Sequence, residues 1–215
     1  MEELDVLRAE NDHLRRLAQQ DSLTGLLNRG AMEARVAALL QENTPGVLLM
    51  IDVDNFKTIN DKYGHLMGDK ALRELACLLG YYFGRGNMIG RMGGDEFAVF
   101  LTGCHTKQQI REQAARLNAR IAQAGKALGI ETGFHVTIGA EFARAADTFA
   151  HLYERADSAM RAEKQGRTMA VQFYDASAKR QAPNRTTHLP RQAPSIDIKY
   201  ISRQLGEKTP AAGAC

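Results

Sequence analysis

Four carboxylates stand at two places where the sequence predicts the end of a strand. Asp52 and Asp54 follow an apolar run, and Asp95 and Glu96 follow a pair of glycines. Alternate residues of a strand share a face, so Asp52 and Asp54 are expected on the same side. Hard divalent cations take oxygen ligands, often one or two carboxylates plus substrate phosphates. The two groups therefore indicate a Mg²⁺ site, with a purely structural carboxylate cluster as the alternative.

The segment around the glycine pair predicts a β-hairpin. Mostly apolar residues at 88–92 and 97–101 flank Gly93-Gly94, and glycine tolerates the positive φ that a two-residue turn needs. A turn without side chains lets a charged ligand such as a nucleotide phosphate approach the backbone. A solvated acidic hairpin tip is the alternative interpretation.

A turn that opens a helix is expected after the first pair of carboxylates, at residues 55–61. The first backbone N–H groups of a helix are free to bind phosphates. Lys57 would add a positive charge there. Phosphate binding is therefore expected next to the candidate metal site.

Together these segments resemble the signature of the GGDEF family of diguanylate cyclases. The matching segments are 21–29 (DSLTGLLNR), 52–61 (DVDNFKTIND), 64–69 (GHLMGD) and 93–97 (GGDEF). The resemblance implies an α/β (α+β) fold of the ferredoxin-like, nucleotide-cyclase-palm type, with a central, mostly antiparallel sheet flanked by helices. It also implies that two GTP molecules are joined into cyclic di-GMP with release of two pyrophosphates.

The resemblance assigns roles to individual side chains. The ligands of Mg²⁺, which Mn²⁺ can replace, would be the carboxylates of Asp52, Asp95 and Glu96 and the carbonyl oxygen of Val53. Asp95, Glu96 and Lys57 would be catalytic, and Asp95 is linked to activation of the 3′-hydroxyl. A metal eases that deprotonation because it stabilises the alkoxide.

Substrate binding is implied at a second set of residues: Phe56, Lys57, Asn60, Asp69, Lys164 and Arg167. Asp69 is expected to select guanine, because a carboxylate can accept from both N1–H and N2–H of that base. An Asn such as Asn60 can add a donor and an acceptor. The alternative for Asp69 is a helix cap, since an acid is favoured early in a helix.

One position departs from the family pattern. The family usually has Lys three residues before the glycine that ends the last long helix, and Glu163 stands there. Lys164 is one position later, about 100° further round a helix. Two outcomes stay open: Lys164 reaches the site with its long side chain, or the affinity for triphosphate is weakened.

The product-binding motif of many family members is also altered. That motif is Arg-x-x-Asp upstream of the hairpin, and the matching positions are Gly84 and Asn87. Arg85 is one place out of register. We therefore expect no tight inhibition by product through that second site.

Composition limits the class of protein. The chain has 215 residues and is 44% hydrophobic, which suits one domain plus extensions. Its three cysteines, Cys77, Cys104 and Cys215, show neither a zinc spacing nor a disulfide framework, so a reducing, cytoplasmic compartment is expected. Neither a signal peptide nor a membrane span is visible in the sequence.

The net charge of +3 is unevenly distributed. The tail 176–215 has seven basic and two acidic residues and is net +5, so the rest of the chain is net −2. A nucleic-acid-binding body would need a basic face, and nucleic acid is therefore not expected as a partner. Four of the five prolines also lie in the tail, which predicts a basic linker or the start of a further domain.

Residues 1–20 predict a coiled-coil-like signalling helix. Heptad core positions are filled by Leu4, Leu7, Leu14 and Ala18, with Asn11 at an inner position that can fix register. A helix of this length has only marginal stability alone. We therefore interpret it as the end of a longer helix from an upstream sensory module. Homodimers are expected. The alternative is an amphipathic helix that packs on its own domain.

Hydrophobic spacing predicts the remaining elements of a catalytic domain at 21–175. Helices are expected at 29–41, with Asn28 as its cap, and at about 66–83, 106–127 and 149–163. Strands are expected at 47–51, in the hairpin, and at 132–142 and 169–174.

Three functions remain open on the sequence. The first is an active diguanylate cyclase that works as a dimer. The second is a GTP-binding regulatory or interaction domain with little turnover, for which Glu163 is the main support. The third is another nucleotidyl or cyclic-nucleotide chemistry on the same fold.

Overall fold

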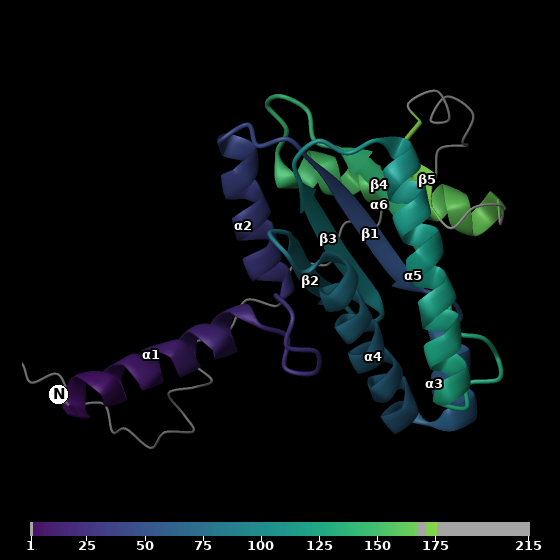
Figure 1. Ribbon diagram of the computed structural model, residues 1–215, viewed down its shortest axis with the longest axis horizontal. Coiled ribbons are helices and arrows are strands. Elements are labelled where there is room, and N and C mark those ends of the chain that lie inside the picture. Colours follow the sequence, from purple (N-terminus) through teal and green to yellow (C-terminus); the bar gives the residue numbers. More distant parts are fainter. Residues whose placement is uncertain (1, 167–170, 176–215) are drawn as a thin grey trace, which may run out of the picture. The chain divides into compact units, whose positions relative to one another are not determined.

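Five strands form one sheet in the order β2-β3-β1-β4-β5 (Figure 1). Neighbouring strands are antiparallel except β4 and β5, which are parallel. This computed structural model describes residues 2–166 and 171–175, all within one compact unit, Met1–Ser177. The α+β fold expected from the sequence, with a mostly antiparallel sheet flanked by helices, is confirmed.

The bounds of the elements agree closely with the sequence pattern. The strands are β1 (Gly46–Val53), β2 (Met88–Gly93), β3 (Glu96–Thr102), β4 (Val136–Phe142) and β5 (Gln172–Phe173). The helices are α1 (Glu2–Gln19), α2 (Arg29–Gln41), α3 (Phe56–Tyr63), α4 (His65–Phe83), α5 (Lys107–Ala127) and α6 (Phe149–Gly166). The predicted start of β4 at 132 is wrong, because its ladder with β1 begins where Val136 pairs with Val53, the last residue of β1.

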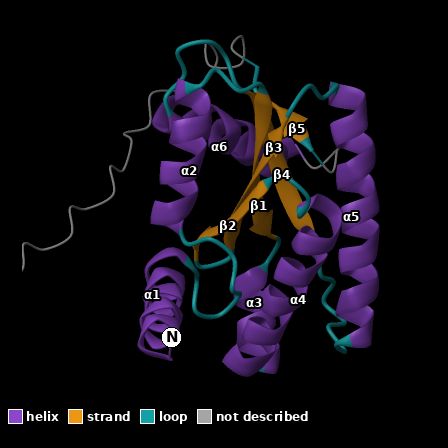
Figure 2. Cartoon of the chain, turned by 60° about the vertical axis from the view of Figure 1, so that its left-hand side comes forward, coloured by secondary structure: helices purple, strands orange, loops and turns teal. Residues whose placement is uncertain are grey.

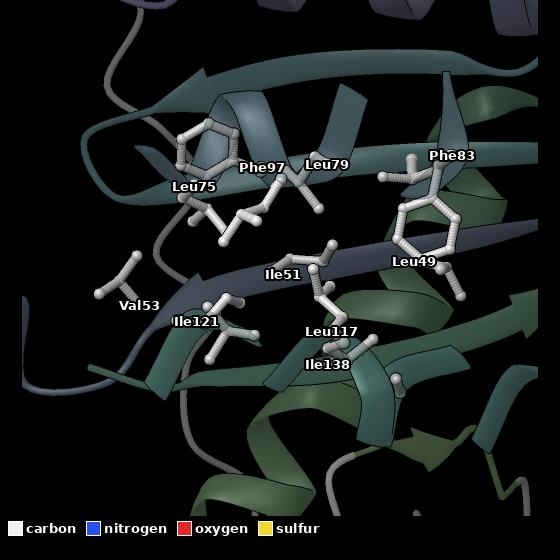
Figure 3. Packing of buried hydrophobic residues seen from close by; sticks show 14 of the residues in the cluster. Leu49, Ile51, Val53, Leu75, Leu79, Phe83, Phe97, Leu117, Ile121 and Ile138 are labelled. Carbon is white, nitrogen blue, oxygen red and sulfur yellow. The ribbon is translucent and has the colours of Figure 1, made fainter. Parts of the chain in front are cut away.

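Helices cover both faces of the sheet, and β1 alternates between them. Leu49 and Ile51 pack with α4 and α5, as Figure 3 shows for Ile51 and Leu117, while Leu48 and Met50 pack with α2 and α6. Figure 2 shows α2 and α5 on opposite sides of the strands. By this alternation Asp52 points to the side of α2 and α6.

Helix α6 lies directly on β4 because position 139 is a glycine. A Cβ atom on Gly139 would lie 2.2 Å from the carbonyl oxygen of Ala156 and 2.3 Å from the backbone nitrogen of Met160. Any side chain there would push α6 off the sheet. The close contact fixes which face of α6 points inward.

Helix α1 presents apolar side chains to solvent. Leu4, Leu7 and Leu14 are 53%, 56% and 56% exposed, and Leu17 is 66% exposed. The alternative in which this helix packs on its own domain is therefore wrong for these four side chains. None of the helices in the described part of the chain is long and apolar enough to cross a membrane.

Three predictions fall wholly or partly outside the described residues. Arg167 and the tail 176–215 lie outside them. The closing strand predicted at 169–174 is seen as Gln172–Phe173 within the part that is described.

Candidate active site

Asp52 and Glu96 lie opposite each other on β1 and β3. Directly paired residues of an antiparallel ladder point to the same face, so both carboxylates lie on the side of α6. Asp95 immediately precedes Glu96, and its carbonyl oxygen accepts a hydrogen bond from the backbone nitrogen of Val53 at 3.3 Å. The structure therefore places the four residues predicted as metal ligands at neighbouring positions of β1 and the hairpin.

The hairpin turn consists of Gly94 and Asp95, one residue later than predicted. Gly93 still belongs to β2 and pairs with Glu96, after a bulge between Arg91 and Gly93. Gly94 has φ +53°, as its place in the turn requires. The shift puts Asp95 in the turn itself, where it is half-buried.

The electrostatics of the paired carboxylates suit a cation. Burial raises the pKa of Asp52, and the charge of Asp95 adds to this while Lys164 opposes it. Burial also raises the pKa of Glu96, as do the charges of Asp52 and Asp95. A divalent cation would relieve this repulsion, and an all-oxygen donor set suits Mg²⁺.

The side chains do not form a closed metal cage. Among the described residues, no group of three or more His, Cys, Asp or Glu side chains could hold a metal ion. The carbonyl oxygen of Val53 and oxygens of a bound substrate would have to complete the coordination. Such an open arrangement is usual for Mg²⁺ in sites that handle phosphates.

Lys164 reaches the site, which is the first of the two outcomes left open by the sequence. Its Nζ donates a hydrogen bond to Oδ1 of Asp52. Ala156 and Met160 are buried against the sheet, and Lys164 continues their row at steps of four residues. The packing of α6 on the sheet thus lets Lys164 contact Asp52.

Residues of α3 and α4 contact each other around Gly68. A Cβ atom on Gly68 would lie only 2.0 Å from Oδ1 of Asn60 and 3.1 Å from Cζ of Phe56. Sequence reasoning did not single out Gly68, although it stands directly before Asp69. A glycine is needed there because Asn60 and Phe56 fill the space of its side chain.

Asp69 is half-buried and is not a helix cap. It is the fifth residue of α4, whose first turn contains no acidic residue and whose N-cap is Gly64. The capping alternative for Asp69 is therefore wrong. Asp69 directly follows Gly68, and Asn60 lies against Gly68. The two residues predicted to read the base, Asn60 and Asp69, therefore come from neighbouring parts of α3 and α4.

The link from β1 to α3 is held by side-chain and backbone contacts. The backbone nitrogen of Asp54 donates to the carbonyl oxygen of His135 at 3.0 Å, and Oδ1 of Asp54 accepts from Oγ1 of Thr137 at 2.6 Å. Asn55 adopts a left-handed conformation with φ 54° at the N-cap of α3. Lys57 is exposed in the first turn of α3, close in sequence to Asp52.

Comparison with known proteins decides the family. The family model described as "Diguanylate cyclase, GGDEF domain" matches residues 18–170. The chain belongs to the GGDEF family. Several relatives of the chain are named as diguanylate cyclases.

Two relatives match parts of this GGDEF domain in sequence. Diguanylate cyclase DgcN of Escherichia coli (strain K12) is 38% identical over 121 residues, which are 54% of this chain and 30% of that protein. Cyclic di-GMP phosphodiesterase PdeR of the same organism is 31% identical over 163 residues, 74% of this chain and 24% of that protein. The chain thus spans about a quarter to a third of the length of these relatives.

A crystal structure of the coiled coil and GGDEF domain of DgcB from Caulobacter crescentus, in complex with c-di-GMP, is also similar. Its TM-score is 0.69 at 26% sequence identity, and the match covers 80% of this chain and 93% of that chain.

Arg91 ties the hairpin of this GGDEF domain to the segment 21–29. Its Nη1 donates to both carboxylate oxygens of Asp21 at 3.1 and 3.2 Å, and its Nε and Nη2 donate to the carbonyl oxygen of Gly94 at 2.9 and 2.6 Å. Neither Arg91 nor Asp21 was predicted as a site residue. The sequence did offer a sign of their importance, because Asp21 begins the motif at 21–29 and Arg91 stands just before the motif at 93–97.

Asn87, at the altered position of the product-binding motif, is used inside the domain. Its Nδ2 donates to the carbonyl oxygen of Phe83 at 2.9 Å, and its Oδ1 accepts from the backbone nitrogen of Thr102 at 2.9 Å. The side chain thus joins the end of α4 to the end of β3. Arg85 is exposed two residues earlier.

Proposed function

We propose that this GGDEF domain is an active, Mg²⁺-dependent diguanylate cyclase that joins two GTP molecules into cyclic di-GMP and releases two pyrophosphates. The observation that carries the proposal is the pairing of Asp52 with Glu96, beside Asp95 and within reach of Lys164. A buried carboxylate cluster at the end of strands costs stability, so a function is the expected reason for it.

In this proposal the metal ligands are Asp52, Asp95, Glu96 and the carbonyl oxygen of Val53. Mg²⁺, or Mn²⁺ in its place, supplies neutralisation of triphosphate charge and a lower pKa for the attacking hydroxyl. The carboxylate of Asp95 takes the proton of that 3′-hydroxyl.

Lysines on either side of the carboxylates bind the triphosphate in this proposal. Lys164 on α6 already contacts a carboxylate of the site, and Lys57 stands in the first turn of α3, where free backbone N–H groups also favour phosphate. Arg167, outside the described residues, remains a proposed phosphate contact.

The base would be read on α3 and α4. Asp69 accepts hydrogen bonds from guanine N1–H and N2–H, Asn60 adds an amide, and Phe56 borders the same space. Adenine lacks the paired donors, so GTP is expected to bind better than ATP.

A homodimer is required by the chemistry in this proposal, because each domain holds one GTP and each 3′-hydroxyl attacks the other nucleotide. The exposed leucines of α1 support pairing of two chains through this helix. An upstream sensory domain would act by orienting the two helices. The similarity to a chain containing a coiled coil and a GGDEF domain supports this arrangement.

The alternative is a GGDEF domain with little turnover that binds GTP for regulation or interaction. The match to part of a protein named as a phosphodiesterase favours it. Glu163 gives this alternative little support. The family lysine is absent at position 163, but Lys164 brings a positive charge to Asp52 in its place.

The test is to incubate the protein with GTP and Mg²⁺ and to identify products by mass spectrometry. We expect cyclic di-GMP and pyrophosphate from wild type, and loss of most turnover in Asp52→Asn and Asp95→Asn with the fold intact. Glu112→Gln, on the exposed side of α5, is the matched control. GTP binding without any product from wild type would favour the alternative.

A further inference from the structure

A second group of charged side chains surrounds Tyr153 on α6. Burial raises the pKa of Tyr153, the charges of Glu96 and Asp157 raise it further, and Arg29 and Arg161 act in the opposite direction. The guanidinium of Arg29 lies over the Tyr153 ring, 5.5 Å from its centroid. Further along α6, Arg161 donates a hydrogen bond to Asp157. The charges of Arg29 and Asp157 both act on the proposed metal ligand Glu96.

Asp157 and Arg161 form an unusual pair. Nη2 of Arg161 donates to Oδ2 of Asp157, whose side chain is 11% exposed, whereas that of Arg161 is 73% exposed. A surface pair at this spacing normally has two exposed partners and contributes little. Here the carboxylate is buried near the like charge of Glu96 and needs a cation.

The pair fixes the guanidinium group of Arg161. A guanidinium carries five N–H donors in a rigid plane, and one of its nitrogens is held by Asp157. Because the Arg161 side chain is largely exposed, donors remain for a ligand. The hydrogen bond to Asp157 restricts the positions that the guanidinium can take, which lowers the entropy that a ligand must remove on binding.

Arg161 and Lys164 place two cations on neighbouring turns of α6. Lys164 contacts Asp52, and Arg161 holds Asp157 beside Glu96. Asp52 and Glu96 are paired across β1 and β3. One helix therefore carries a cation that contacts Asp52 and, three residues earlier, a second cation that pairs with Asp157.

We propose that Arg161 is a further triphosphate-binding residue, which Asp157 holds so that its free N–H groups meet phosphate oxygens. The inference rests on the proposed function in one respect, because it takes a guanosine triphosphate as the ligand. An arginine suits the task because its planar fork can grip two phosphate oxygens at once.

The competing explanation is that Arg161 only neutralises Asp157. The two roles separate in a double-mutant cycle, in which Arg161→Ala is compared in the wild-type and Asp157→Asn backgrounds. The probe is guanosine 5′-[α,β-methylene]triphosphate with Mg²⁺, because its α–β bridge is not cleaved. GMP is the ligand control, and Arg120→Ala on α5 is the protein control.

We expect Arg161→Ala to weaken binding of the triphosphate probe about tenfold in both backgrounds, as for loss of one charged hydrogen-bonding group. The amide oxygen introduced by Asp157→Asn can still accept a hydrogen bond from Arg161, so that variant removes the negative charge but keeps the contact that holds Arg161. GMP binding and the Arg120→Ala variant should stay within about twofold of wild type. Arg161→Lys should recover part of the loss. A tenfold loss seen only when Asp157 is present would overturn the proposal, and so would an equal loss for GMP.

Two further outcomes are decisive. If Arg161→Ala does not fold, Arg161→Gln and Arg161→Lys replace it, and equal probe binding by these two overturns the proposal. If wild type binds the probe but makes no cyclic di-GMP from GTP, only the proposed function falls. Absence of probe binding by wild type overturns the inference itself.

Discussion

At the scale of single residues, the site contains carboxylates whose ionised forms are disfavoured by burial. Asp52 and Glu96 face each other with raised pKa values, since burial and neighbouring charges both disfavour the ionised forms. Acids whose pKa is raised by folding destabilise the folded protein at neutral pH. Lys164 offsets part of that cost at Asp52.

Gly68 is the residue at which a single methyl group is expected to matter. In Gly68→Ala the new Cβ would lie 2.0 Å from Oδ1 of Asn60, so the amide must move. We expect GTP binding to weaken about tenfold, on the order of one lost hydrogen bond to a charged or polar partner. Titration calorimetry with GTP and Ca²⁺ measures this.

The matched control for Gly68→Ala is Gly80→Ala on the same helix. A Cβ on Gly80 meets nothing within 4 Å, and Ala favours a helix by about 0.5–1 kcal/mol over Gly. Gly80→Ala should bind GTP normally and unfold at a slightly higher temperature. Equal GTP affinity of both variants would mean that Asn60 is not positioned by Gly68.

At the scale of elements, Arg91 and Asp21 hold the hairpin against the segment before α2. Burial alone would raise the pKa of Asp21, but hydrogen bonds from Thr24 and from Arg91 outweigh it and lower that pKa. A carboxylate of this kind stabilises the fold above its unfolded pKa, near 3.8, and the contribution is lost as the pH falls through its lower folded value.

We expect Asp21→Asn to lower the free energy of unfolding by about 1–2 kcal/mol at pH 7, because charged hydrogen bonds to Arg91 become neutral ones. The difference from wild type should shrink as the pH falls below about 4. Thermal unfolding at pH 7, 5 and 3 measures this, with Asp61→Asn on α3 as an exposed control. A difference of the same size at pH 3 would show that the charge of Asp21 is not the cause.

At the scale of the whole molecule, the proposed reaction requires two domains to meet for each product molecule. Specific activity is therefore expected to rise with protein concentration until the dimer is saturated. Deleting residues 1–20 should lower the rate at a fixed low concentration, because the exposed leucines of α1 are lost.

The dimer prediction is checked by assays across a dilution series with sedimentation in parallel. Leu7→Ser with Leu14→Ser is the finer variant, because it removes apolar contact while leaving the chain length intact. Constant specific activity with a monomer at every concentration would contradict the prediction.

Inhibition by product is a second question that the proposed activity raises for the whole molecule. Asn87 is committed to Phe83 and Thr102, and Gly84 has no side chain, so cyclic di-GMP lacks both partners of the usual second site. We expect no tight inhibition at saturating GTP, measured as pyrophosphate release during titration with cyclic di-GMP. Tight inhibition that Arg85→Ala removes would show that Arg85 has rebuilt the site.

Much of the fold was predictable because its signals are local. Helix α2 begins and ends where predicted, since Asn28 accepts a hydrogen bond from the backbone nitrogen of Ala31 at 2.9 Å and caps it. Every residue of β1 is buried, so its apolar run identified the central strand. The four motifs pointed to the family, which the comparisons then confirmed.

By itself, then, the sequence determined the family, the class of fold and which residue types stand in the motifs, because capping, hydrophobic periodicity and turn chemistry act over a few residues. Tertiary structure decided which of those side chains meet. Lys164 contacts Asp52 across 112 residues of sequence because Gly139 seats α6 on β4. Such contacts depend on how whole elements pack, and no spacing within one element encodes that.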